Sequence, residues 1–507
     1  MRRVLALLLS LTLLCGICMI PVCADDDRLP MPGDPVPTII VHGLGQMTLN
    51  VEMPDATVNF ALWSLGVPDL SSVLPKLIWR AFLSLLLQHD IGLSEALIED
   101  VLRPMFAPIT RNADGSSVYP QTVEKYNDSM ADSPESVQNT VYGRVRIRDF
   151  APAEFAAYTY YYAFNSFGSQ QENVIGLYDF CKDIQVRTGA EKINLVGLSQ
   201  GGAVITGFLD AYPGYAAAVL QKLLFVIPAL DGSKLLTSIF AGDFNYDGLY
   251  SEIIPSLMPN NWMGYALNLV LRILSRNFVK ELLDGALEFL VGECLGRSSA
   301  MWALLPSGDV PTLAERWLTD PASAPLRAEV EAHVRAQQAL SGHLADLQSA
   351  GVEIYNVAEY DRPLYAFVND FEETNSDTII HLTSASPGVT CTAPGQVLPV
   401  QPNASVCTDV LHNHRSPSGT VNAATAQLCE TTWYISNADH ESTPRNNTVV
   451  RLVCRLLLDD SITDVHSSPD CPQFIETPPK ETAVLSWMDK LIYDCFKALS
   501  DFWDWVD

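Results

Sequence analysis

The segment INLVGLSQGGAVITGF, Ile193 to Phe208, constrains the fold more than any other part of the chain. Strand-forming apolar residues lead into a Gly-x-Ser-x-Gly motif, and an apolar stretch compatible with a helix follows at once. This order is typical of a nucleophile elbow, in which a tight turn lifts a serine hydroxyl clear of a sheet. Residues beside the serine must be small in such a turn, and Gly197 and Gly201 meet that requirement. We therefore predict that Ser199 is a nucleophile.

Short apolar segments alternate with helical segments on both sides of this motif. We predict strands at 38–41, 158–164, 192–197, 222–230 and 352–358, and helices at 173–187 and from the serine to about residue 212. Alternation of this kind indicates a parallel sheet that is covered by helices on both faces. The expected fold class is therefore α/β, in one domain over residues 36–458.

Two mainly helical stretches interrupt the alternation, at about 58–109 and about 232–350. Both are rich in large apolar residues, and the first has LPKLIWRAFLSLLLQH at its centre. A lid or an acyl channel over a site would use such material. Plain core helices would use it equally, so both interpretations stay open.

The two ends of the chain differ from this domain. Residues 1–24 have the pattern of a secretory signal peptide, so we expect a secreted or lumenal protein. Removing them takes away two arginines and changes the formal net charge from −28 to −30. This acidity argues against nucleic acid as a partner. The tail at 459–507 carries an amphipathic helix from about Ala483, which we interpret as packed on the domain rather than inserted in lipid, because its polar face is mostly aspartate.

Cysteine usage fits the same compartment. Of the 11 cysteines, Cys15, Cys18 and Cys23 leave with the signal peptide, and an even number in a secreted chain predicts disulfide bonds. The spacing does not reveal their pairing. Glycosylation sequons are found at Asn127, Asn403 and Asn446.

A serine nucleophile of this type needs two backbone N–H groups that bind the oxyanion of the tetrahedral intermediate. One is expected from the residue after the serine, Gln200, at the start of the new helix. The other is expected from the loop after an earlier strand. HGLGQ, residues 42–46, ends the first predicted strand, and its glycines allow a close backbone approach to a substrate. We therefore predict Leu44 and Gln200 as the donors.

The serine also needs a histidine that takes its proton and an acid that orients the histidine. The expected chain order is serine, acid, histidine. The histidines that follow the last predicted strand are His381, His412, His414, His440 and His466. We select His440, because the polar loop SNADHESTP precedes the last periodic segment and can bring the ring over the sheet edge.

The remaining candidates are less clear from spacing. Asp361 and Asp377 are nearly equal as the acid. His412 and His414 could suggest a metal pair, but they lie in LHNHRSPSG, which has no adjacent strand or helix to position it. We interpret them as surface residues, and we predict neither a metal nor an organic cofactor.

Several of these motifs resemble those of secreted α/β-hydrolases of the lipase type, within them the lecithin:cholesterol acyltransferase-like lipases. The similar stretches are IIVHGLGQ, TGAEKINLVGLSQGGAV, WALLPSG, GVEIYNVAEYDRPLY, SDTIIHLTSAS and NADHESTPRNNTVVRLVCRLL. The resemblance implies an α/β-hydrolase fold with helical cap or lid insertions, selects Asp377 as the acid and supports His440. The chain departs from that family at Leu198, where a histidine is usual, and the run from Ser199 to Gly202 is equally similar to palmitoyl-protein thioesterases and cutinases.

The expected function is thus a secreted serine hydrolase that cleaves carboxylic esters of lipids, with transfer of the acyl group to an alcohol as a variant. Its partners would be a lipid or acyl-ester substrate and, transiently, a membrane or lipid surface. A palmitoyl-protein-type thioesterase is the main alternative. A secreted lipid-binding protein without catalysis is another, and the oligomeric state is not predicted.

Overall fold

The computed structural model describes residues 28–60, 76, 79–80, 83–84, 87, 90–245, 248, 276–399 and 414–477. The predicted signal peptide, the sequon at Asn403 and the predicted helix from Ala483 lie outside these residues.

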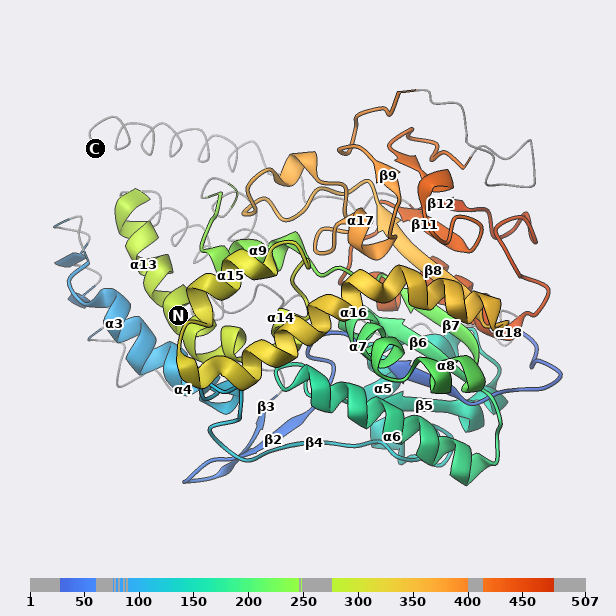
Figure 1. Ribbon diagram of the computed structural model, residues 1–507, viewed down its shortest axis with the longest axis horizontal. Helices are drawn as coiled ribbons and strands as arrows, with labels where there is room; N and C mark the ends of the chain where they lie inside the picture. The colour runs from blue at the N-terminus through green and yellow to red at the C-terminus, as the bar shows by residue number, and fades with distance from the viewer. Residues whose placement is uncertain are drawn as a thin grey trace.

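A seven-stranded sheet forms the centre of the described chain (Figure 1), and every pair of neighbouring strands in it is parallel. Its order is β12-β11-β8-β7-β6-β1-β5. The strands are β1 (Thr38–Val41), β5 (Thr159–Tyr162), β6 (Ile193–Leu198), β7 (Leu220–Val226), β8 (Glu353–Tyr360), β11 (Thr432–Ser436) and β12 (Phe474–Glu476). The first five confirm the predicted strands to within a few residues. The last two were not predicted, and they extend the sheet beyond β8.

Helices cover both faces of this sheet. One face carries α6 (Gln170–Thr188), α7 (Gln200–Ala211), α8 (Pro213–Val219) and α16 (Ala324–Ser349). The other face packs against α5 (Glu135–Arg144) and α18 (Asn447–Leu458). Side chains of β1, β6 and β7 are buried on both sides, because alternate residues enter the two apolar clusters. This explains why the strands have nearly continuous apolar sequences.

The described part of the second insertion contains α9 (Lys234–Ala241), α13 (Arg276–Phe289), α14 (Ser299–Trp302) and α15 (Val310–Trp317). They share one apolar cluster with the end of the first insertion, which holds α3 (Leu93–Leu97) and α4 (Arg103–Phe106). The long helix α16 differs from these helices. It packs on α7 and β8, and therefore serves as the crossover from β7 to β8 rather than as part of a cap.

The expected helical start of the first insertion, at about Val58, is wrong. Thr57–Phe60 is instead strand β3, which pairs antiparallel with β2 (Leu49–Glu52), and β2 also pairs with β4 (Gln121–Val123). Leu49 and Phe60 face each other in this small sheet and are buried in the apolar cluster of the insertions. That burial favours a strand over a helix here. Short elements complete the described chain: α17 (Leu382–Ala385), β9 (Thr390–Cys391) and β10 (Val421–Asn422).

The described cysteines do not support the predicted disulfide bonds. Cys181, Cys294, Cys391, Cys454 and Cys471 carry thiols in this part of the chain. Cys181 and Cys454 are buried in the clusters on opposite faces of the sheet, so the sheet itself separates them. None of the helices among the described residues is long and apolar enough to span a membrane.

Candidate active site

Ser199 occupies a strained turn between β6 and α7. Its backbone has a φ of 50° and a ψ of −115°, values that a residue with a side chain adopts only when the surrounding structure enforces them. A Cβ atom at Gly201 would lie 2.2 Å from the carbonyl oxygen of Val41, and one at Gly197 would lie 2.7 Å from Cδ1 of Ile205. Backbone contact therefore requires glycine at position 201, and a side chain at position 197 would displace Ile205, as predicted for a nucleophile elbow.

The structure brings Ser199, His440 and Asp377 together. Nε2 of His440 lies 2.9 Å from Oγ of Ser199, and Nδ1 lies 2.6 Å from Oδ2 of Asp377. The three residues follow β6, β11 and β8, respectively, and the carboxyl ends of parallel strands meet at one edge of a sheet. Carboxylate oxygens accept hydrogen bonds, so Nδ1 is the donor to Oδ2 and Nε2 directs its lone pair to the serine hydroxyl.

Asp377 is held rigidly and is 1% exposed. Its Oδ1 accepts hydrogen bonds from the N–H groups of Ile379 and Ile380, at 2.9 and 2.6 Å, which leaves Oδ2 for the imidazole. The N–H of His440 also donates to the backbone oxygen of Asp377, at 2.9 Å. Asp361, the other acid that spacing allowed, accepts a hydrogen bond from Oγ1 of Thr420 at 2.5 Å instead.

The electrostatics of His440 suit a proton acceptor. Burial alone would lower its pKa, but the charge of Asp377 and the hydrogen bond to it act in the opposite direction, together with Glu441 and Asp439. The net pKa of His440 lies above the ordinary value. A histidine of this kind gains basicity while its orientation stays fixed.

The two predicted oxyanion donors lie on either side of Ser199. In the loop after β1, the N–H groups of Gly43, Gly45 and Gln46 donate to Oε1 of Gln46, Oγ of Ser166 and the carbonyl of Gly43, respectively. Within the described ranges, the N–H of Leu44 has no such partner. Gln200 starts α7, so its N–H is one of the first-turn donors that a helix leaves unpaired. Both N–H groups are therefore available to a ligand.

Sequence reasoning missed His42, which orients this loop. The ring is fully buried and stacks on Phe164, with centroids 3.9 Å apart. Burial lowers its pKa to about 3, so the ring is neutral. Nε2 accepts the N–H of Phe164 at 3.1 Å, so the proton is on Nδ1, which donates to the carbonyl of Gly43 at 2.6 Å. The predicted strand that precedes His42 was its only sequence signal.

A second missed residue is Glu359, in β8. Its side chain is buried beside Asp377, and Oε1 accepts a hydrogen bond from Oγ1 of Thr443. Burial, followed by the negative charge of Asp377, raises the pKa of Glu359 well above its ordinary value. The shift favours the uncharged form of this carboxyl group, next to the candidate acid. The sequence shows only a glutamate within an apolar strand, which is a weak signal.

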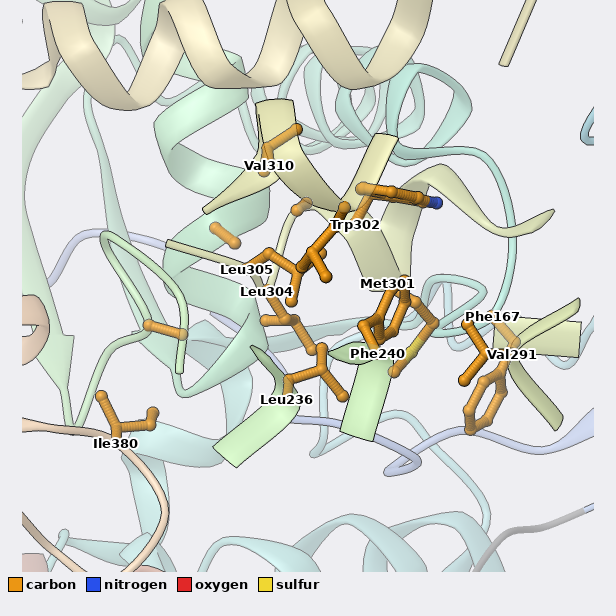
Figure 2. Close-up of a cluster of buried hydrophobic side chains, with 14 of the residues drawn as sticks. Phe167, Leu236, Phe240, Val291, Met301, Trp302, Leu304, Leu305, Val310 and Ile380 are labelled. Carbon is orange, nitrogen blue, oxygen red and sulfur yellow. The ribbon is translucent and has the colours of Figure 1, made fainter. Parts of the chain in front are cut away.

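A pocket of about 400 Å³ opens beside Ser199 and His440. Leu236, Met301 and Leu304 of the second insertion line it, and Ile379 and Ile380 line it beside the candidate acid. Figure 2 shows Leu236, Met301 and Leu304 grouped with buried neighbours such as Phe240 and Trp302. The second insertion thus contributes side chains to the apolar cluster and, on one side, forms a wall of the pocket. Arg144, Glu441 and Arg445 are the charged residues of the lining.

The other late histidines are not part of this site. His381 is buried, and burial lowers its pKa to about 4. His412 lies outside the described residues. The interpretation of His414 as a surface residue is wrong, because it is 1% exposed. Its loop folds inward against Glu430 and His466, which are too distant in the sequence to be recognised as neighbours.

The parallel sheet, its covering helices and the serine turn after β6 together define an α/β-hydrolase fold. No protein-family model matches the chain, and no curated protein matches its sequence. Among solved structures, one similar chain is phospholipase PlaB from Legionella pneumophila, with 12% identity and a TM-score of 0.24. That alignment covers 52% of this chain and 43% of the phospholipase, less than half of its length.

Proposed function

We propose that the protein is a serine hydrolase that cleaves carboxylic esters of lipids through a covalent acyl-enzyme. The observation that carries the proposal is the position of His440, within 2.9 Å of Ser199 and 2.6 Å of Asp377, at the mouth of an apolar pocket. A hydroxyl, a base and an acid in this order are the parts that nucleophilic acyl transfer requires.

Each residue has a defined step in this proposal. Oγ of Ser199 attacks the acyl carbonyl while Nε2 of His440 takes its proton. The backbone N–H groups of Leu44 and Gln200 bind the oxyanion, each contributing about 3 kcal/mol to the transition state. The imidazolium then gives the proton to the leaving alcohol, and an acyl ester on Ser199 remains. Water attacks that ester with His440 as the base, and the free acid leaves.

The lining of the pocket supports a lipid substrate. Leu235, Leu236, Met301 and Leu304 offer an apolar wall beside Ser199, and a volume of about 400 Å³ is in the usual range of ligand pockets. The resemblance to lecithin:cholesterol acyltransferase-like lipases favours the same substrate class. The N-terminal pattern favours a secreted or lumenal enzyme. Both the family membership and the compartment are part of the proposal.

The test compares the purified protein with Ser199→Ala on four substrates of matched acyl chain: a phospholipid, a glyceride, a sterol ester and an acylated cysteine peptide. We expect hydrolysis of a lipid ester by the native protein and its loss in the variant. Faster cleavage of the cysteine thioester than of any lipid ester would make the protein a thioesterase. Absence of turnover on all four, with lipid still bound, would instead indicate a binding protein.

A further inference from the structure

Three metal-ligating side chains meet at the amino ends of β11 and β12, away from the candidate active site. They are His414, Glu430 and His466, and one potential ligand atom from each lies within 4.8 Å of the other two. Glu430 lies two residues before the start of β11, whereas His440 follows the carboxyl end of the same strand. A five-residue strand spans about 16 Å, so the two groups of residues lie at opposite ends of β11.

The ring of His414 is preset for coordination. Its Nδ1 lies 2.8 Å from Oε1 of Gln473. Nε2 of Gln473 donates to the carbonyls of Cys429 and Thr432, at 2.6 and 3.3 Å, which fixes the amide with its oxygen toward His414. The proton of His414 is therefore on Nδ1, and the lone pair of the neutral ring is on Nε2. A histidine whose other ring nitrogen donates to a carbonyl is the usual arrangement in metal sites.

Two further observations favour a cation here. Oε1 of Glu430 is buried and makes no hydrogen bond to the residues that the structure describes, which is costly for a carboxylate unless a positive charge compensates it. The backbone of His414 has a positive φ of 48°, an unfavourable conformation for a residue with a side chain. The fold accepts this strain and places the ring 6.0 Å, between centroids, from that of His466.

We propose that His414, Glu430 and His466 bind one divalent transition-metal ion, Zn²⁺ by preference, with a fourth position open. Two imidazole nitrogens and one carboxylate oxygen are a donor set that Zn²⁺ accepts in tetrahedral geometry. Ligand atoms around such an ion lie about 3.3 Å apart, so each pair of ligand atoms needs to close by up to about 1.5 Å. The ion joins the loop of His414 to the segments before β11 and β12 and so stabilises the packing of these segments. The proposal does not depend on the proposed hydrolase function.

The experiment uses the full chain, stripped with a chelator, reloaded with Zn²⁺ and passed through a desalting column. The zinc content is measured by inductively coupled plasma mass spectrometry, and thermal unfolding is measured with and without Zn²⁺. We expect about one ion per chain and a higher Tm with the ion. Glu430→Gln and His466→Ala should each weaken Zn²⁺ binding by at least about tenfold and remove the rise in Tm. Circular dichroism checks that both variants fold.

His343→Ala is the matched control, because His343 is a histidine on α16 that pairs with Asp210 and lies outside the three-residue cluster. It should bind Zn²⁺ like the native chain. Loading with Co²⁺ should produce the visible absorption of a four-coordinate site in the native chain and in this control, but not in His466→Ala. The proposal is overturned if the native chain retains less than a tenth of an equivalent, or if folded Glu430→Gln and His466→Ala retain as much Zn²⁺ as the native chain.

Discussion

The imidazole of His42 donates a hydrogen bond from Nδ1 to the carbonyl oxygen of Gly43, at 2.6 Å. This contact determines where the next N–H points. In a planar trans peptide the C=O and N–H groups have opposite directions, so a Gly43 carbonyl turned toward His42 turns the N–H of Leu44 away from it. His42 is therefore a positioning residue for one of the two proposed oxyanion donors.

We predict that His42→Phe lowers kcat by about tenfold or more, with a much smaller change in KM, because a misaligned donor stabilises the transition state less. The phenyl ring keeps the stack on Phe164 but leaves the N–H of Phe164 unpaired, which costs about 1–3 kcal/mol of folding stability. The carbonyl of Gly43 loses the imidazole and keeps its hydrogen bond from the N–H of Gln46. Steady-state kinetics well below the Tm measures the first effect. An unchanged kcat with a lower Tm would show that His42 only supports the fold.

The two candidate acids provide a matched pair of variants. Asp377→Asn should lower kcat by about 10⁴-fold while the fold is kept, because the amide no longer holds the histidine in the productive tautomer. Asp361→Asn should change kcat little, since Asp361 bonds to Thr420 rather than to His440. Kinetics and circular dichroism on both variants decide the assignment. A large loss in Asp361→Asn and a mild one in Asp377→Asn would transfer the role to Asp361.

The pH dependence of the reaction should report His440. The base must be neutral to accept the serine proton, so kcat/KM should increase as the pH rises through the pKa of His440. Asp377 raises that pKa and burial lowers it, and the net shift is upward. The midpoint should therefore lie above the ordinary value for histidine, and Asp377→Asn should move it to lower pH. If the midpoint of the kcat/KM profile is the same in Asp377→Asn as in the native chain, the profile does not report the ionisation of a His440 that is paired with Asp377.

Glu359→Gln tests the buried carboxylic acid. Because the folded-state pKa of Glu359 is raised, the native state holds a proton that the unfolded state loses, and the free energy of unfolding falls as the pH rises above the unfolded-state pKa. Glutamine has no proton to lose and still accepts the hydrogen bond of Thr443. The variant should therefore gain stability relative to the native chain as the pH rises above the unfolded-state pKa of glutamate.

Urea unfolding at several pH values measures this difference. The control is Glu353→Gln, the same change at the exposed start of β8, which should show no gain that grows with pH. A loss of stability in Glu359→Gln that increases toward pH 8 would mean that the carboxyl group is ionised in the folded chain.

Local sequence patterns were sufficient to predict the nucleophile elbow. Its strand, turn and helix are contiguous around Ser199, and the glycines near the serine indicate a tight turn. His440 could be placed only in a loop before the last helix. The strand that precedes it, β11, is short and lies among loop-forming residues, so the sequence did not reveal it. The burial of single polar side chains was harder to predict from the sequence than the strands and helices. The sequence signals for His42 and Glu359 are weak and His414 has none, and most of the groups that contact these residues are distant along the chain.

The central claim is that Ser199 is a nucleophile activated by His440. Its most direct test is labelling of the purified native protein with a fluorophosphonate, followed by intact-mass measurement and peptide mapping. The account predicts one adduct per chain on Ser199, none in Ser199→Ala, and labelling of His440→Ala that is slower by orders of magnitude. A folded native protein that takes up no label, or an adduct that persists in Ser199→Ala, would contradict it.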